Sequence, residues 1–321
     1  MRAIVQDSPG RGPPPSAEAV RLCLRRLLNT RVRAYRRELA NCRRRLSKRS
    51  IHELRIAIRR LLVCLRLVGV AQKEPPGVSA SLRAQLRALG DVRDTQVQLQ
   101  LIKKGAFRSA PEMRPLRDHL RRRKRRRMKA AAQALKSDKA LRRLQGWRPR
   151  LEKGGPRVVP RLRRLVDGRI RAAIDSLSSI AGSDTPDSEA LHRCRVLSRE
   201  CDYIVEALQP CWRGDPAGEL LSSLRARQQG IGRRRDRELL LRRMVRMVRE
   251  GELQAEPARR FGETLLSEPS KRVKPSFLRD WREVLETLLA RSARRRARRF
   301  SPLARALNPS TLRRWTTGPS R

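Results

Sequence analysis

Aromatic residues are scarce in this sequence. Phe, Trp and Tyr together make up 3% of its 321 residues. Proteins that hold single-stranded nucleic acid usually stack the bases on aromatic rings. The composition therefore disfavours a protein that reads single-stranded bases. It leaves duplex binding open, because that depends on phosphate contacts and counterion release.

Long apolar runs and metal-ligand spacings are also missing. No eighteen consecutive residues are apolar, and the start of the chain lacks the apolar segment of a signal peptide, so we expect a cytoplasmic protein with no membrane partner. The six cysteines form no CxxC pair, and we expect them to be buried, reduced thiols. We expect neither a bound metal nor any other cofactor.

Acidic residues are few relative to basic ones. Asp and Glu number 31 against 79 Lys and Arg, which gives a net charge of +48. A chain with this self-repulsion needs an anionic partner or dense counterions. Arg and Lys occur from Arg21 to Arg321, among regularly spaced Leu, Ile and Val. The pattern therefore favours a folded basic surface over a disordered basic arm.

The apolar periodicity predicts an all-α protein. The expected helices cover about 16–46, 51–71, 79–105 and 112–146, followed by 157–180, 187–209, 216–249 and 255–290. Ser50 with Glu53, and Thr185 before Pro186, predict two of the helix starts. We expect a disordered leader at 1–15 and a basic C-terminal tail at 291–321. The Gly and Pro cluster at 154–156 divides the helical region 16–290 into a first repeat, 16–150, and a second, 156–290.

One helix of each repeat carries a stripe of basic residues beside an apolar face. In the first repeat the stripe is His52, Arg55, Arg59 and Arg66, and in the second it is His192, Arg195, Arg199 and Tyr203. A single stripe of this kind is commonly a solvated helix face. Its repetition favours contact with an anion, whose oxygens the planar arginine fork can pair. The two histidines are either phosphate donors or structural residues, and we expect Tyr203 to pack within the bundle.

A second marker follows each stripe: LGDVRD ends at Asp94, and IGRRRD ends at Asp236. Gly90 and Gly232 lie inside these helical patterns, although glycine destabilises a helix interior by about 1 kcal/mol relative to alanine. Close approach of a neighbouring helix is the simplest reason for them. We expect Asp94 and Asp236 to hold arginines in place rather than to act as bases. Secondary candidates for anion contact are Arg83, Arg87, Arg93, Arg225 and Arg235.

These paired motifs resemble the CHAD domain, a helical domain named for its characteristic histidines. The resemblance spans about residues 16–290, from IHELRIAIRRLLVCLRLV and LRAQLRALGDVRD to LHRCRVLSRECDYIVEAL and LRARQQGIGRRRD, with the family's typical Tyr and Glu at Tyr203 and Glu206. It implies two pseudo-symmetric four-helix bundles around a basic central cavity or groove. It also implies binding of inorganic polyphosphate without catalysis and association with polyphosphate granules.

The sequence departs from the family pattern in two kinds of place. Leu62 and Asp202 stand where the family often has a basic residue, which weakens the stripes at matching positions. The ExExK strand motif of a triphosphate-tunnel metalloenzyme, a frequent partner domain in this family, does not occur.

Two other classes of function compete with polyphosphate binding. A nonspecific nucleic-acid or ribosome-associated protein would also carry this charge, and the run RRRKRRR at 121–127 goes all round a helix and suits either ligand. An enzyme of phosphate metabolism is disfavoured, since phosphoryl transfer generally needs carboxylates that hold Mg²⁺ or a nucleophile. No such group accompanies the stripes.

Overall fold

The structure is a computed structural model that describes residues 17–103, 110–137, 139–147, 157–181, 188–208 and 235–267. Within these ranges every regular element is helical, as the periodicity predicted. The elements are α1 (Ala17–Arg44), α2 (Lys48–Val68), α3 (Val78–Lys103), the short 3₁₀ helix η2 (Pro111–Met113), α4 (Arg114–Lys136), α5 (Lys139–Gly146), α6 (Val158–Ala181), α7 (Ser188–Leu208) and α9 (Ala255–Ser267). A further helix covers 235–249.

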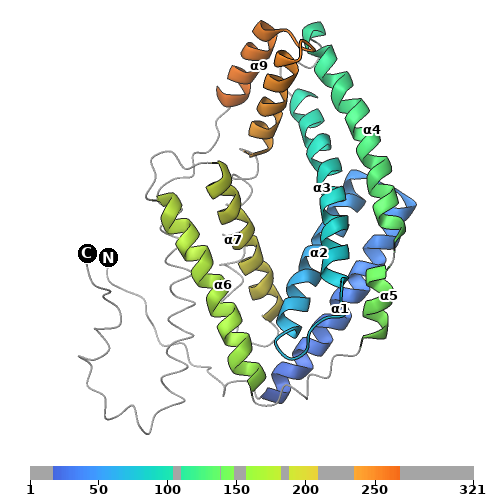
Figure 1. Ribbon diagram of the computed structural model, residues 1–321, viewed down its shortest axis with the longest axis vertical. Helices are drawn as coiled ribbons and strands as arrows, with labels where there is room; N and C mark the ends of the chain where they lie inside the picture. The colour runs from blue at the N-terminus through green and yellow to red at the C-terminus, as the bar shows by residue number, and fades with distance from the viewer. Residues whose placement is uncertain are drawn as a thin grey trace, which may run out of the picture.

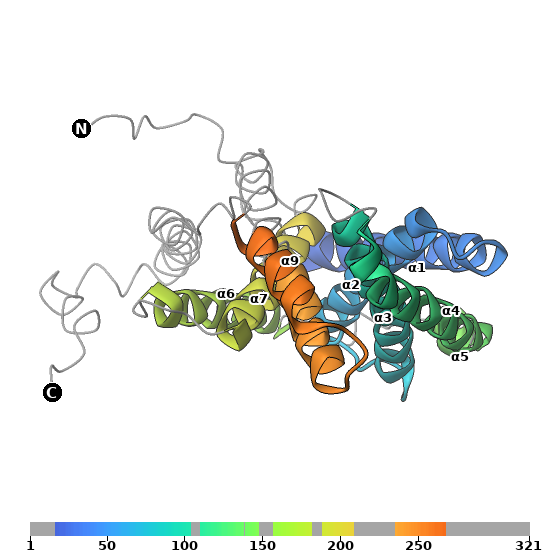
Figure 2. The ribbon, with the colours of Figure 1, turned by 90° about the horizontal axis from the view of Figure 1, so that it is seen from above.

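The helices of the two halves of the chain lie side by side (Figures 1 and 2). The neighbours in space are α6 with α7, α7 with α2, α2 with α1 and α3, and α3 with α4. The helix at 235–249 and α9 lie at the top of Figure 1, near the start of α4. The two stripe-bearing helices, α2 and α7, are therefore direct neighbours.

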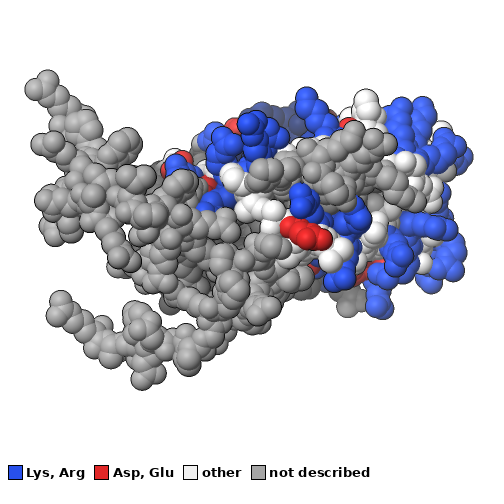
Figure 3. All heavy atoms as spheres, turned by 90° about the horizontal axis from the view of Figure 1, so that it is seen from below, with Lys and Arg blue, Asp and Glu red and all other residues white. Residues whose placement is uncertain are grey.

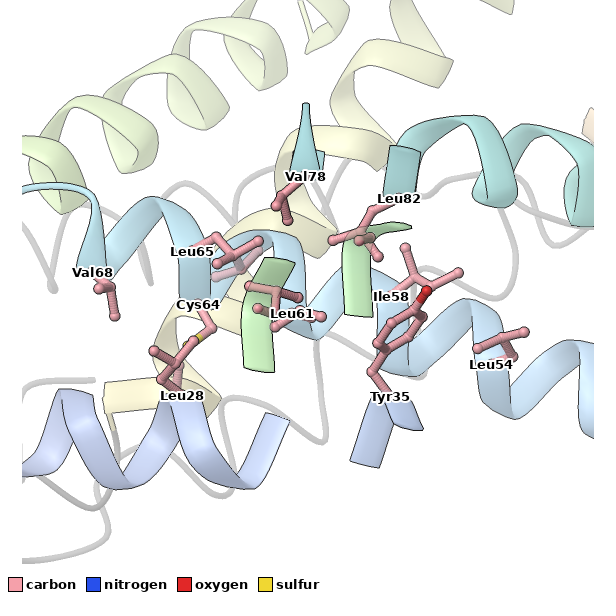
Figure 4. Packing of buried hydrophobic residues seen from close by; sticks show 14 of the residues in the cluster. Leu28, Tyr35, Leu54, Ile58, Leu61, Cys64, Leu65, Val68, Val78 and Leu82 are labelled. Carbon is pink, nitrogen blue, oxygen red and sulfur yellow. The ribbon is translucent and has the colours of Figure 1, made fainter. Parts of the chain in front are cut away.

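A main core fills the space between α1, α2, α3 and α5, and it extends into α6 and α7 through Leu162 and Ile204. Figure 4 shows its centre, where Leu28 and Tyr35 of α1 face the apolar side of α2. Tyr35 is fully buried, and its hydroxyl donates to Gln85 Oε1 at 2.8 Å, so the polar tip of the ring is satisfied inside the core.

A second, upper core joins elements from opposite ends of the chain. Ile102 of α3, together with Leu116 and Leu120 of α4, packs against Leu240 and Met244 of the helix at 235–249. Both cores therefore contain residues from before and after position 150. Burial of these apolar side chains is the main force that holds the two halves together.

Some predicted boundaries are wrong. The helix expected at 112–146 is divided, because Ser137 adopts an extended backbone after α4 and α5 begins at Lys139. The helix expected from 51 begins at Lys48, since Ser47 is the N-cap and forms a capping box with Ser50 rather than with Glu53. In that box the Ser47 hydroxyl accepts from the Ser50 amide at 3.0 Å, and the Ser47 amide donates to the Ser50 hydroxyl at 3.0 Å.

Other expectations fall outside the described residues. These are the leader at 1–15, the Gly and Pro cluster at 154–156, the cap at Thr185, the first part of the helix expected at 216–249, the end of the helix expected at 255–290 and the tail at 291–321.

The cysteines only partly match the expectation. Cys42, Cys64, Cys194 and Cys201 are free and buried, and burial raises the pKa of Cys64 and of Cys201 to about 12, so these thiols are unreactive. Cys23 is disulfide-bonded, so the expectation of a reduced thiol is wrong there. None of the helices in the described ranges has the length and apolar character needed to cross a membrane.

Candidate functional site

The two basic stripes meet at the boundary between α2 and α7. Their arginines form, with one residue of α3, a central arginine cluster that consists of Arg55, Arg59, Arg93, Arg195 and Arg199. All five side chains are partly buried. The geometry thus brings together residues that are far apart in sequence and lines them along one interface.

The guanidinium groups of this cluster repel one another. Burial, followed by the positive charge of Arg59, lowers the pKa of Arg55 to about 10. Burial and the charge of Arg199 lower the pKa of Arg195 to about 10 in the same way. The pKa of Arg199 is also lowered, by burial and by Arg59. These groups remain charged at neutral pH, so an anion placed between them would relieve their mutual repulsion.

Arg93 differs from its neighbours because the protein itself supplies its counter-charge. Its guanidinium donates to the buried carboxylate of Asp236 through two bonds, Nη1 to Oδ1 at 2.5 Å and Nη2 to Oδ2 at 2.9 Å, and Nη1 also donates to Asp94 Oδ1 at 3.2 Å. Burial disfavours the charged form, but the bonds with Asp236 raise the pKa of Arg93 above its ordinary value. This bidentate pair links the LGDVRD marker to the IGRRRD marker over 143 residues of sequence.

Gly90 makes room for an arginine rather than for a helix. A Cβ on Gly90 would lie 2.9 Å from Arg55 Nη1, and that same nitrogen donates to the Leu86 carbonyl at 3.2 Å. The expectation that a neighbouring helix approaches at this glycine is therefore wrong, since the close neighbour is the end of a side chain. Gly232 lies outside the described residues.

Three arginines of the cluster are left without a protein partner in the part of the chain that the structure describes. Arg59, Arg195 and Arg199 form no hydrogen bond or ion pair there, and the Nε of Arg195 is fully buried. The buried Nδ1 of His192, one turn before Arg195, also has no partner among the described residues. Buried donors of this kind are normally satisfied, so these groups are the ones available to a ligand.

Arg66 lies further along α2, in a separate group that contains the carboxylate of Glu200. It forms an ion pair with Glu200 of α7, whose carboxylate also lies 3.4 Å from Arg169 Nε. Burial, then the charges of Arg169 and Arg83, lower the pKa of Arg66. Because Glu200 already neutralises part of this charge, Arg66 is less available to an anion than Arg59.

The remaining predicted residues occupy different positions. His52, Arg83 and Arg87 are exposed, and Arg235 is partly buried beside Asp236. Tyr203 packs against the main core. Arg225 lies outside the described residues.

The two departures from the family pattern have different structural settings. Leu62 packs against the main core, so it contributes apolar contact where a basic residue was expected. Asp202 is buried, and its negative charge partly offsets the burial and the neighbouring cations that lower the pKa of Arg199. Asp202 therefore stabilises a cation of the cluster.

Sequence reasoning missed how α7 is attached to the first half of the chain. Glu206 accepts from Arg31 of α1 at 3.0 Å, and from both Nε and Nη2 of Arg60 of α2 at 3.2 and 3.0 Å. Glu206 follows Tyr203 at helical spacing on the stripe-bearing helix, and this was the available signal. The pairing fixes α7 against α2 and so sets the distance between the two stripes.

Comparison with known proteins agrees with this arrangement. The model of the CHAD domain family matches residues 26–246, more than half of the chain. The chain belongs to the CHAD family. The predicted family is thus confirmed. The CHAD domain structure from the plant Ricinus communis is similar in fold, with a TM-score of 0.62 at 20% sequence identity, and the match covers 85% of this chain and 92% of that one.

A second solved structure, PptA from Streptomyces chartreusis, is also similar. Its TM-score is 0.57 at 17% identity, and the match covers 87% of this chain and 99% of that one. At these identities the likeness shows the fold alone. No curated protein matches the sequence.

Proposed function

We propose that this CHAD protein binds inorganic polyphosphate, without catalysis, at the boundary between α2 and α7, where the central arginine cluster lies. The observation that carries the proposal is the set of partly buried cations Arg59, Arg195 and Arg199 at one interface, none of which has a hydrogen bond or ion pair with another described residue. A chain of phosphates supplies closely spaced negative charge, which matches closely spaced guanidinium groups. Arginine can pair two phosphate oxygens at once and stays charged at neutral pH.

The cluster fits a polyanion without bases better than it fits nucleic acid. Tyr203 is the aromatic residue near it, and that ring packs against the main core instead of offering a face to a base. Affinity then comes from paired charges and released counterions, so it falls steeply with salt. By analogy with duplex DNA, six to ten phosphate contacts would lose about 10³- to 10⁵-fold in affinity between 50 and 200 mM salt.

Family membership supports a further proposal about the wider organisation. We propose two pseudo-symmetric four-helix bundles, formed by residues 16–150 and 156–290, with a basic groove between them. Among the described groups of this interface, no cluster of three or more His, Cys, Asp or Glu could hold a metal. The cellular role that accords with this chemistry is association with polyphosphate granules in the cytoplasm.

A direct test compares two double variants by isothermal titration with long-chain polyphosphate. Arg59→Gln with Arg199→Gln removes two unpaired cations of the cluster. Arg33→Gln with Arg36→Gln removes two exposed cations of α1. Loss of two charge-assisted contacts should weaken binding by about 100-fold in the first variant, against about twofold in the control. Equal losses in the two variants would assign binding to overall charge.

Nonspecific nucleic-acid binding is the second candidate, and the basic surface favours it. Lys and Arg gather on the described surface where α1 and α5 lie (Figure 3). Competition separates the two ligands. Long-chain polyphosphate should displace bound DNA or RNA at equal phosphate concentration, and the reverse result would favour nucleic acid as the ligand.

A further inference from the structure

A second group of arginines lies above the central cluster, on α4 and the helix at 235–249. The run at 121–127 is not uniformly solvated: Arg121, Arg122, Arg125 and Arg126 are exposed, whereas Arg123, Lys124 and Arg127 are partly buried. The buried side of the run faces Arg243 and Arg246 of the other helix. We call Arg123, Arg127, Arg243 and Arg246 the upper arginine cluster.

The upper core holds these arginines in place. Leu120 lies one turn before Arg123 on α4, and Leu240 and Met247 lie one turn on either side of Arg243. These apolar side chains pack the two helices together, so the guanidinium groups of Arg123 and Arg243 lie close to each other. Cations on rigid, packed helices are positioned more firmly than cations on loops.

The upper cluster has far more positive than negative charge. Asp91 of α3 lies 2.9 Å from Arg127 Nη1, and this carboxylate acts on both Arg123 and Arg243. Burial, then the charges of Arg123 and Arg246, lower the pKa of Arg243 to about 10. The Nε atoms of Arg123 and Arg243 are buried and have no hydrogen-bond partner within the described ranges. A solvated helix face would show neither feature.

The two clusters are linked through α3 and the helix at 235–249. The helix at 235–249 begins beside Asp236, which Arg93 of the central cluster binds, and Arg243 follows seven residues later. Seven residues correspond to about 10 Å along a helix axis. On α3, Asp91, which pairs with Arg127, lies two residues from Arg93, which pairs with Asp236. One extended anion can therefore run from one cluster to the other.

We propose that the upper arginine cluster is a second anion site, which binds further phosphate groups of the same chain and makes long-chain polyphosphate the preferred ligand. The inference rests on the proposed function. A short chain occupies one cluster at a time, whereas a long chain occupies both and gains the second set of contacts at high effective concentration. The two sites together act as a sensor of chain length.

The test measures the affinity of the full chain for tripolyphosphate and for long-chain polyphosphate. The variant Arg123→Gln with Arg243→Gln removes two buried cations of the upper cluster. The matched control, Arg122→Gln with Arg125→Gln, removes two exposed cations from α4. We expect the first variant to lose about tenfold or more in affinity for the long chain and at most about twofold for tripolyphosphate. The control should lose about twofold for both ligands.

Three outcomes would overturn this inference. Equal loss for the long chain in both variants would mean that only total charge matters. Equal loss for tripolyphosphate and the long chain would mean that the upper cluster is not a separate site. If the unmodified protein binds neither ligand, the proposed function fails together with the inference. Thermal unfolding of each variant checks the fold, and the exposed Arg246→Gln replaces the double variant if that variant is unstable.

Discussion

The central arginine cluster and helix α9 use the same residue type in opposite electrostatic states. On α9, Arg259 pairs with Glu256 at 2.9 Å and Glu263 at 2.5 Å, and Arg260 pairs with Glu256 at 2.9 Å. These pairs are exposed, and hydrogen bonds from the two arginines lower the pKa of Glu256 to about 2. In the central cluster, Arg59, Arg195 and Arg199 are partly buried and have no such partner among the described residues.

The difference predicts which arginines are available to a ligand. An arginine that already holds a carboxylate must give it up before it can bind phosphate, and an exposed pair contributes little either way. A partly buried arginine without a direct carboxylate partner gains a paired counter-charge when an anion binds it. Total charge is therefore a poor guide to the site, whereas the absence of protein counter-charge is a good one.

The largest expected effect is on polyphosphate affinity, when two arginines of the central cluster are replaced and the result is compared with replacement of two arginines of α9. Arg195→Gln with Arg199→Gln should weaken polyphosphate binding by about 100-fold, because two phosphate contacts are lost. Arg259→Gln with Arg260→Gln should change it by about twofold or less, since their charge is already neutralised. Titration calorimetry at one salt concentration measures both. Comparable losses would remove the distinction between the two regions.

Two substitutions within the central arginine cluster should have different effects on the free energy of unfolding. Arg93→Gln leaves the buried Asp236 carboxylate without its bidentate partner, and we expect a loss of about 2 kcal/mol, below the usual range for a fully buried pair because Arg93 is 31% exposed. Arg195→Gln removes a partly buried charge that has no hydrogen bond or ion pair with the described residues, and it should leave stability unchanged or increased. Urea unfolding without ligand gives both values. A clear destabilisation by Arg195→Gln would reveal a protein contact at that residue.

Binding should also depend on pH in the alkaline range. The pKa of Arg55 and of Arg195 is about 10 in the folded protein, so both are charged below that pH and lose their protons above it. A bound anion favours the protonated forms, and affinity should therefore fall as pH rises above about 10, by about tenfold per pH unit for each proton required. The variant Arg55→Gln with Arg195→Gln controls for lysine titration. An equally steep pH profile in that variant would contradict the assignment.

The smallest effect concerns two glycines in helices. Alanine at the open position Gly168, where a Cβ meets nothing within 4 Å, should stabilise the protein by about 1 kcal/mol. Alanine at Gly90 gains the same helix propensity but displaces Arg55 from the Leu86 carbonyl, so the net change should be near zero and affinity should fall a few-fold. Thermal unfolding and titration of the two variants decide this. Equal stabilisation by both would show that Gly90 has no role in placing Arg55.

Much of the fold could be predicted from sequence because helical periodicity is a local signal. The apolar faces of α2 and α7 and the stripes beside them repeat every turn, and this was enough to place Arg55, Arg59, Arg195 and Arg199 on corresponding faces. The break between α4 and α5 was missed, since Ser137 carries no strong helix-breaking signal.

The partners of the site residues could not be predicted, because they depend on contacts between distant segments. The pairing of Arg93 with Asp236 spans 143 residues, and no periodicity specifies it. The same holds for Arg31 and Glu206, which are 175 residues apart. The run at 121–127 is basic all round its helix, so its sequence could not show that Arg123 and Arg127 face another helix.

The most direct test of the account is a crystal structure of the protein with polyphosphate bound. The account predicts a phosphate chain between α2 and α7, with its oxygens in contact with Arg59, Arg195 and Arg199. Phosphates bound only to exposed arginines of α1, with the central arginine cluster empty, would contradict it.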